Sequence, residues 1–436
     1  MKTVFLNVDL LDGTLDDRGE MKLRKGVSVV VDGDTIVDVY EGKAPETSDA
    51  QVIDLTGKTM LPGLINLHVH LASSGKPPKA NAKPVNYKKL FDTLSAIKPA
   101  MAVFLRMEKD LAKKHLSSGV TTIRTVGGVL DHDGRIRDEI KAGKAVGPRI
   151  LCSNTAVSVP GGHFAGSLAT EAETPEMAAE HVEKIASTNP DWIKLMITGG
   201  VMDASAEGEP GVLRMAPELI RAACDKAHSL GYKVAAHVES PEGVLAALEN
   251  GVDTVEHGAV PDERMISLFK ERNAAVVCTV SPAVPYVKLP EEISHCGDLG
   301  RANGRIVTHG IIECAKRCLE AGVPVGLGND AGCNFVTPFD FWRELYYFSK
   351  YVGVSPAFAL HTATLGNAKL LGMENEIGSV EAGKKADLLV VSGNPLDSFN
   401  ALRTPWMVVA GGKIYSKPKL KKRADVETAL DSLMDK

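Results

Sequence analysis

The chain has 436 residues and a formal net charge of −5, because 50 lysines and arginines stand against 55 aspartates and glutamates. Apolar residues make up 44% and charged residues 24%, which are globular fractions, so a disordered, collagen-like or coiled-coil protein is excluded. Without a basic excess to neutralise phosphates, we expect no nucleic-acid partner. The length accommodates one α/β barrel of more than about 250 residues together with a small second domain.

The start of the sequence does not predict export or membrane insertion. Asp9 interrupts the first apolar run where a secretory core would continue, and no later stretch reaches about 18 uncharged apolar residues. The seven cysteines are scattered without CxxC spacing. We therefore expect a cytoplasmic protein with reduced thiols and no membrane contact.

Residues near both ends predict short β-strands. Apolar residues dominate 27–31 and 35–40 around an Asp-Gly-Asp turn, and again 386–392 and 406–415. We predict that residues 1–58 and 377–420 form one composite β-sandwich, followed by a helical tail at 421–436.

Between these ends, β-rich runs alternate with amphipathic helical stretches. The candidate strands are 63–70, 120–126, 148–152, 192–198, 233–238, 253–257, 275–279 and 324–328, and the helices include 106–117, 176–187, 217–230 and 306–320. Eight strands followed by helices predict an α/β fold, a (β/α)8 TIM barrel over 59–376. A doubly wound sheet, the alternative, would show a glycine-rich turn after its first strand, and none is present. Two long proline-containing connections, 72–100 and 280–303, are predicted to be lid or specificity loops.

Five side chains suited to metal binding end the predicted strands. His68 and His70 are two residues apart in the first strand, so both imidazoles face the same side. His237, His257 and Asp330 end the fifth, sixth and eighth strands. Because burying so many ionisable groups is costly without a cation, we predict that they hold metal.

Lys194 lies in the apolar strand 192–198. An ammonium group pointing inward among metal ions would be desolvated and repelled, so its pKa should fall. The neutral amine can add carbon dioxide and become a carbamate whose two oxygens suit a bridge between two cations. A lysine paired with an acid inside the barrel is the alternative interpretation.

Two stretches of the sequence resemble the metal-dependent amidohydrolase superfamily in its binuclear, carboxylated-lysine form. They are Met-Leu-Pro-Gly-Leu-Ile-Asn-Leu-His-Val-His at 60–70 and Gly-Ser-Val-Glu-Ala-Gly-Lys-Lys-Ala-Asp-Leu-Leu-Val-Val at 378–391. Residues 161–163, 193–200 and 328–331 resemble its prolidase-like branch, which is related to imidazolonepropionases and contains dipeptidases, carboxypeptidases and ochratoxin-type amidases. The sequence departs from that branch at Thr125, where Asp is common, and at Asn329, where Thr is usual.

The resemblance implies a role for each strand-end residue. The more buried of two divalent ions would be held by His68, His70 and Asp330, the more exposed one by His237 and His257, and carboxylated Lys194 would bridge them. Zinc is the default metal, with iron, manganese and cobalt as alternatives. The ions would supply a bridging hydroxide, and Asp330 would pass its proton to the leaving amine.

Three further residues are candidates for substrate contacts. His163 follows a Gly-Gly turn, although a plain loop histidine is an equal interpretation, and Arg124 has an internal acid partner as its alternative role. Tyr286, together with His295 and Arg301, lies in the second long connection.

The leading functional interpretation is hydrolysis of a peptide-like amide bond in a small molecule. A cyclic-amide hydrolase or deaminase is an alternative because Glu239 follows the fifth strand, and a lactone, ester or phosphoester hydrolase is another. A scaffold relative without activity is the non-enzymatic alternative. We also expect a homo-oligomer.

Overall fold

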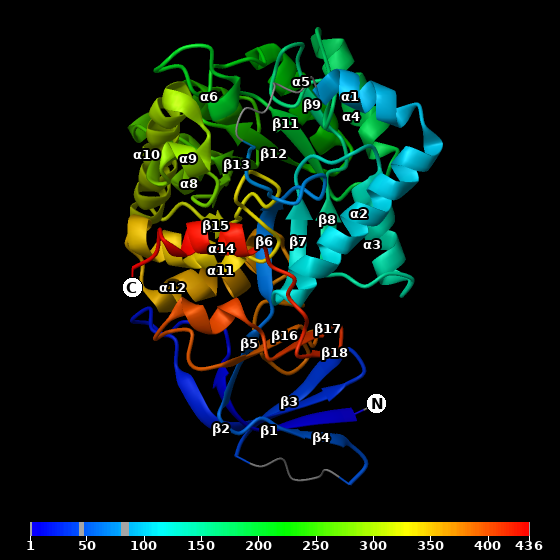
Figure 1. Ribbon diagram of the computed structural model, residues 1–436, viewed down its shortest axis with the longest axis vertical. Helices are drawn as coiled ribbons and strands as arrows, with labels where there is room; N and C mark the ends of the chain where they lie inside the picture. Colours follow the sequence, from blue (N-terminus) through cyan, green and yellow to red (C-terminus); the bar gives the residue numbers. More distant parts are fainter. Residues whose placement is uncertain (1, 43–47, 80–86, 436) are drawn as a thin grey trace.

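The computed structural model describes residues 2–42, 48–79 and 87–435, and it shows a TIM barrel next to a smaller β-sheet (Figure 1). The barrel strands are β6 (Leu64–Val69), β7 (Val120–Thr125), β8 (Arg149–Cys152), β11 (Trp192–Met196), β12 (Lys233–Val238), β13 (Thr254–His257), β14 (Ala275–Cys278) and β15 (Val325–Leu327). Each of the eight predicted strands is confirmed, and its ends agree within two residues.

The barrel strands pair in parallel and close into a ring. β6, β7 and β8 pair in order, and β11 to β15 pair in order. The ring closes where the His70 N–H donates to the Ala331 carbonyl at 2.8 Å and the Asp330 N–H donates to the His68 carbonyl at 3.0 Å. Two short strands, β9 (Ala156–Ser158) and β10 (Ala169–Glu171), extend the sheet beside β11. The closing hydrogen bonds therefore join three of the predicted metal-binding residues.

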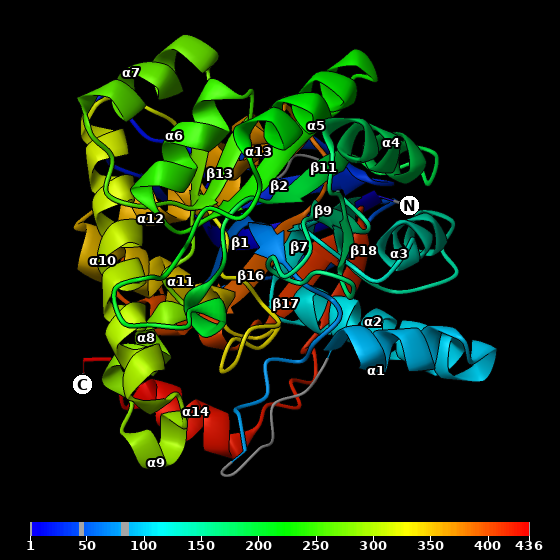
Figure 2. The same ribbon diagram turned by 90° about the horizontal axis from the view of Figure 1, so that it is seen from above.

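Helices surround the barrel, as the view from above shows (Figure 2). They are α1 (Tyr87–Ser95), α2 (Lys98–Ser117), α3 (His132–Lys141), α4 (Pro175–Ala186), α5 (Pro217–Ser229), α6 (Pro241–Glu249), α7 (Glu263–Arg272), α8 (Ala283–Lys288), α9 (Glu291–Ser294), α10 (Gly297–Glu320), α11 (Phe341–Tyr347), α12 (Pro356–His361), α13 (Asn367–Leu370) and α14 (Ala424–Asp431). Within the described residues, none of these helices is long and apolar enough to cross a membrane.

Strands from both ends of the chain form one eight-stranded sheet below the barrel (Figure 1). They are β1 (Lys2–Leu11), β2 (Leu23–Asp32), β3 (Thr35–Glu41), β4 (Gln51–Asp54), β5 (Lys58–Pro62), β16 (Leu388–Ser392), β17 (Met407–Ala410) and β18 (Lys413–Ser416). The two halves join where β5 pairs antiparallel with β16. Phe5, Val29, Met60 and Leu388 belong to a shared apolar core, so burial of apolar surface holds the halves together.

Of the two connections expected to be long loops, the second is largely helical and the first is helical in part. Residues 280–303 contain α8, α9 and the first turns of α10, which begins nine residues before the predicted start at 306. Residues 72–100 contain α1 and the start of α2, while 80–86 lie outside the described residues. The second connection is helical because its prolines, Pro282, Pro285 and Pro290, stand at or just before helix starts, where a missing N–H costs nothing. The role of both connections as lid or specificity regions stays a prediction.

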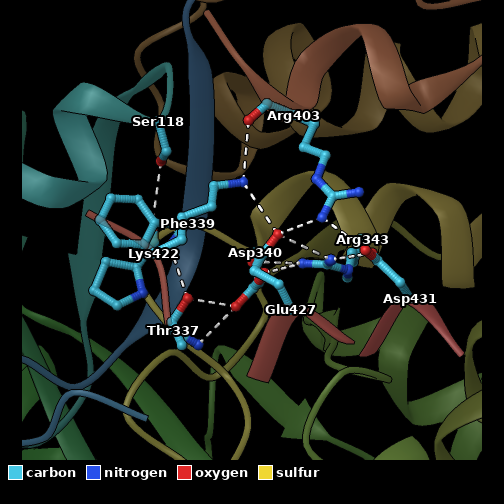
Figure 3. A network of polar contacts seen from close by, with 10 residues as sticks. Ser118, Thr337, Phe339, Asp340, Arg343, Arg403, Lys422, Glu427 and Asp431 are labelled. Atoms are coloured by element: carbon cyan, nitrogen blue, oxygen red, sulfur yellow. Dashed lines mark hydrogen bonds and ion pairs between the residues drawn. The ribbon is translucent and has the colours of Figure 1, made fainter. Parts of the chain in front are cut away.

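Helix α14 is fixed to the barrel by a network of charged side chains (Figure 3). Arg343 of α11 is only 1% exposed, and its guanidinium contacts Asp340, Glu427 and Asp431. The neighbouring Glu344 accepts hydrogen bonds from the backbone N–H groups of residues 280 and 281, both at 2.7 Å. Of these two adjacent residues of α11, Arg343 holds α14, and Glu344 holds the backbone directly after β14.

Candidate metal centre and its pocket

His68, His70 and Asp330 converge at the carboxyl end of the barrel. The Nε2 atoms of the two histidines lie 3.5 and 3.3 Å from Asp330 Oδ1. That oxygen is buried and has no hydrogen-bond partner within the described residues. These nitrogen–oxygen separations are slightly longer than a hydrogen bond and are typical of ligands that share one metal ion. The three residues therefore fit a divalent metal.

A second group of possible ligands lies beside the first. One ligand atom each from His237, Glu239 and His257 lie within 4.8 Å of one another. The ring centroids of His237 and His257 are 4.7 Å apart, and those of His68 and His257 are 4.8 Å apart. The two groups therefore adjoin, as two neighbouring metal positions would.

The local backbone conformation orients the side chains of His257 and Asp330. His257, at the end of β13, and Asp330, three residues after β15, adopt positive φ angles of 69° and 55°. This conformation costs free energy for residues other than glycine and is concentrated at functional sites. It interrupts the alternation of side chains along β13, so that Glu256 and His257 are both buried at the barrel interior.

Contacts through Nδ1 hold three of the four histidines in one orientation, whereas His237 has its Nε2 3.3 Å from the carbonyl of Gly199. His68 Nδ1 lies 2.8 Å from Glu256 Oε2, and His70 Nδ1 lies 2.9 Å from the carbonyl of residue 127. His257 Nδ1 lies 2.7 Å from the hydroxyl of Thr279. When Nδ1 carries the proton, Nε2 is left with a free lone pair, which is the form that binds metal.

Burial sets the protonation of these ligands. Burial lowers the pKa of His68 to about 4 and holds the pKa values of His237 and His257 well below their usual range. Burial alone would raise the pKa of Asp330, but the nearby His68 and His70 hold it well below its usual range. Neutral imidazoles and an ionised carboxylate are the states that metal binding requires.

Lys194 lies on the inner face of the barrel and is 1% exposed. Its Nζ has no hydrogen-bond partner within the described residues, so the alternative of a lysine hydrogen-bonded to an internal acid is not found there. Burial, reinforced by the Arg124 guanidinium, lowers the pKa of Lys194 to about 8. A buried amine with a lowered pKa and no partner fits carbamate formation.

Arg124 does not line the pocket, and its expected role in binding a substrate carboxylate is corrected. Its guanidinium is 1% exposed and contacts Glu256 at 2.6 Å, while Nε donates to the carbonyl of Leu67 at 2.8 Å. It also lies over the Trp192 ring, 4.7 Å from its centroid. The alternative interpretation, pairing with an internal acid, describes its position.

The other two substrate candidates line the pocket together with the ligand groups. His163 stacks on His237 with centroids 4.3 Å apart, and its Nδ1 lies 2.5 Å from Asp203 Oδ2. The Tyr286 hydroxyl accepts a hydrogen bond from Asn334 Nδ2 at 2.9 Å. The remaining wall is mostly apolar and includes Phe164, Met202, Pro282, Val307 and Ile311.

Two lower-ranked candidates lie away from this pocket lining. Arg301 donates to the carbonyls of Val287 and Leu289 at 3.2 and 2.9 Å, so it holds the connection between α8 and α9. His295 ends α9 in a left-handed conformation.

Sequence reasoning did not assign roles to Glu256 and Asp203. Glu256 is fully buried and joins His68 to Arg124, while Asp203 holds His163. Burial alone would raise the pKa of Glu256, but Arg124 and the bond from His68 bring it below its usual range. A carboxylate directly before a strand-end histidine was the available signal for Glu256. Asp203 comes from a short 3-10 turn, Val201–Asp203, 40 residues from its partner.

Glu239 and Cys333 also line the pocket. Burial, with the nearby carboxylates of Asp330 and Asp203, raises the pKa of Glu239 to about 8. Burial also holds the pKa of the Cys333 thiol well above its usual range. All seven cysteines are free thiols, and the other six are buried.

Comparisons with known proteins place these residues in a family context. The sequence profile named "Amidohydrolase family" matches residues 59–415. A crystal structure described as a "putative prolidase from Bifidobacterium longum" has a TM-score of 0.85 and 36% sequence identity, and the match covers 99% of this chain and 98% of that one. Ochratoxinase from Aspergillus niger is 24% identical over 70% of this chain and 67% of its own length. Imidazolonepropionase from Symbiobacterium thermophilum is 23% identical over 79% of this chain and 77% of its own length.

Proposed function

The chain belongs to the amidohydrolase family, in its prolidase-like and imidazolonepropionase-related branch. On this basis we propose that it is a binuclear metal-dependent hydrolase of amide bonds. Its substrates would be small peptide-like molecules, of the dipeptide, carboxypeptidase or N-acyl amino acid type. The prolidase and ochratoxinase names of its relatives support this class.

The observation that carries the proposal is the pair of adjoining ligand groups at one pocket. Each group offers two imidazoles and a carboxylate, and Lys194, unpartnered and buried, lines the same pocket. The proposed ligands are His68, His70, Asp330, His237, His257 and Lys194 as its carbamate. Zinc suits imidazole and carboxylate donors and is the proposed metal.

The chemistry divides between the ions and the chain. Bound divalent ions would polarise the scissile carbonyl and lower the pKa of a water molecule toward neutrality. Asp330, held ionised by its histidine neighbours, accepts the proton of the attacking water and passes it to the leaving nitrogen. His163, whose Nδ1 contacts Asp203, lines the pocket and offers its Nε2 for a hydrogen bond with the substrate. The apolar wall around Phe164 and Ile311 excludes bulk water.

Cyclic-amide hydrolysis or deamination is the second candidate. Glu239 supports it, because its carboxylate lies with His237 and His257 at the site. A glutamate near the fifth strand is the acid–base group that the resemblance associates with deaminases. The buried, unpartnered Lys194 favours the binuclear amidase over this alternative.

The test uses full-length protein purified without chelator. We expect about two zinc ions per chain and release of free amino acids from at least one member of a dipeptide and N-acyl amino acid library, read by mass spectrometry. Asp330→Asn should lower kcat at least about 100-fold while the protein stays folded. If protein loaded with two ions cleaves lactones, phosphoesters or ring amides but no linear amide, the proposal is overturned.

Two further properties are proposed, the cellular compartment and the oligomeric state. The free thiols support a reducing compartment such as the cytoplasm. A homo-oligomer remains our expectation, and light scattering of the purified protein would test it.

A further inference from the structure

Glu239 occupies a position that neither the strand-end motifs nor the proposed mechanism explains. It is the first residue after β12, and its backbone N–H donates to the Thr198 hydroxyl at 3.1 Å. Its side chain lines the same pocket as the four histidines. The backbone is therefore fixed at the point where the carboxylate enters the site.

The carboxylate lies within reach of an ion held by the second ligand group. One of its oxygens is within 4.8 Å of the ligand nitrogens of His237 and His257. Two ligands on one zinc ion, each bound at about 2.0 to 2.2 Å, are separated by up to about 4 Å. A small side-chain adjustment brings all three donors onto one ion.

One oxygen of this carboxylate also needs a partner. Glu239 Oε2 is shielded from solvent and makes no hydrogen bond within the described residues. A buried carboxylate oxygen without a donor is costly, and a cation satisfies it. The lining of the pocket contains no arginine, and its one lysine is Lys194.

We propose that Glu239 is a direct ligand of the second metal ion, which completes a site of two histidines and one carboxylate. This inference deepens the proposed binuclear function and rests on it. The two positions then have matching donors, His68, His70 and Asp330 in one and His237, His257 and Glu239 in the other. Three protein ligands with an open fourth position describe a catalytic zinc site, so the second ion does not depend on the Lys194 carbamate alone.

The experiment measures metal binding and needs no substrate. Full-length apoprotein is titrated with zinc, and with cobalt for its absorption spectrum, in buffer depleted of carbon dioxide and in buffer with bicarbonate. We expect wild-type protein to bind two ions in both buffers. In Glu239→Gln the second ion should bind at least about 100-fold more weakly without bicarbonate and recover partly with it, because only the carbamate then supplies a negative ligand.

Two variants serve as matched controls. Asp203→Asn removes a neighbouring carboxylate that contacts His163 and is in neither ligand group, and it should leave both zinc affinities within about threefold of wild type. Glu239→His keeps a ligand at the position and should restore the second ion without bicarbonate. Equal zinc affinities in Glu239→Gln and wild type would overturn the inference, whether or not the substrate profile changes.

The inference and the proposed function fail separately. If wild-type protein hydrolyses amides and Glu239→Gln still binds two ions tightly, only the ligand role is wrong. If binding of the second ion depends on Glu239 but no linear amide is cleaved, the ligand role stands and the proposed reaction is wrong.

Discussion

Replacing Glu256 by glutamine should weaken the first metal position through His68. Three donors face the Glu256 carboxylate: His68 Nδ1 at 2.8 Å, Arg124 Nη2 at 2.6 Å and the Thr254 hydroxyl at 2.7 Å. A glutamine side chain offers one oxygen and one NH2 group in place of two oxygens. In at least one of the three contacts, a hydrogen-bond donor would therefore face another donor.

The consequence depends on which way the amide turns. If its oxygen stays with Arg124 and Thr254, the NH2 group faces His68 Nδ1 and drives the imidazole proton to Nε2, the atom that faces Asp330. If it turns the other way, the buried guanidinium of Arg124 loses its carboxylate. We expect zinc affinity at the first position to fall about 10- to 100-fold, or about 1.4 to 2.7 kcal/mol.

The assay is zinc binding in competition with a chromophoric chelator, with circular dichroism as the check of folding. Thr254→Val is the matched control, because it removes a contact to Glu256 and Arg124 but leaves the bond to His68. Its zinc affinity should stay within about threefold of wild type. A folded Glu256→Gln protein that binds the first zinc ion as tightly as wild type would refute this reasoning.

Three other predictions concern stability. Arg343→Met should reduce the free energy of unfolding in urea by about 3 kcal/mol, because it leaves the buried Asp340 carboxylate without its paired cation. Glu427 and Asp431 keep their contacts with Arg403. An unchanged midpoint of urea unfolding would contradict this prediction. Burial raises the pKa of Glu344 from 4.5 to about 7, so between these values the unfolded chain binds fewer protons and stability should fall as pH rises. Glu344→Gln should remove that part of the pH dependence in denaturant titrations, and a pH profile identical to wild type would argue against it. Burial likewise raises the pKa of Glu108 to about 10, so this carboxyl group should be neutral at pH 7. Glu108→Gln then replaces one neutral group by another, and calorimetry at pH 7 should show a change in Tm of less than about 4 °C. A larger loss of Tm would show that the carboxyl is ionised.

The barrel was predictable from the sequence because its strands are parallel and buried on both faces. Such strands appear as continuous apolar runs, and in this chain four of them have a candidate metal ligand at or close to their carboxyl ends. The apolar runs at both ends predicted the composite sheet in the same way. The confirmed elements are therefore those whose signal lies within a few consecutive residues.

The helices after β14 were missed because their residues argue against helix in isolation. Pro282 and Pro290 directly precede α8 and α9, and Pro285 lies in the first turn of α8, where a proline breaks no hydrogen bond. α10 begins with several glycines, which lower helix propensity. A Cβ at Gly304 would lie 3.5 Å from Tyr286 Cβ, an ordinary van der Waals separation, so the packing of α10 on α8 does not require this glycine.

The site was predictable in its strand-end residues but not in their supports. The contacts of Glu256 with His68 and of Asp203 with His163 join residues 188 and 40 positions apart, which no local pattern records. Arg124 shows the converse case. Its positive charge suggested that it binds a substrate carboxylate. In the structure its guanidinium instead contacts Glu256 and the ring of Trp192 inside the barrel.

The sheet built from both ends has a consequence for synthesis of the protein. β5 ends at Pro62 and its partner β16 begins at Leu388, so about 325 residues are translated between them. At roughly 5 to 20 residues per second, this interval lasts roughly 15 to 65 seconds. During that time the apolar face of β1 to β5, including Phe5 and Met60, lacks the core residues that the C-terminal segment supplies, such as Leu388. The nascent chain therefore presents a binding surface for chaperones until the barrel has been completed.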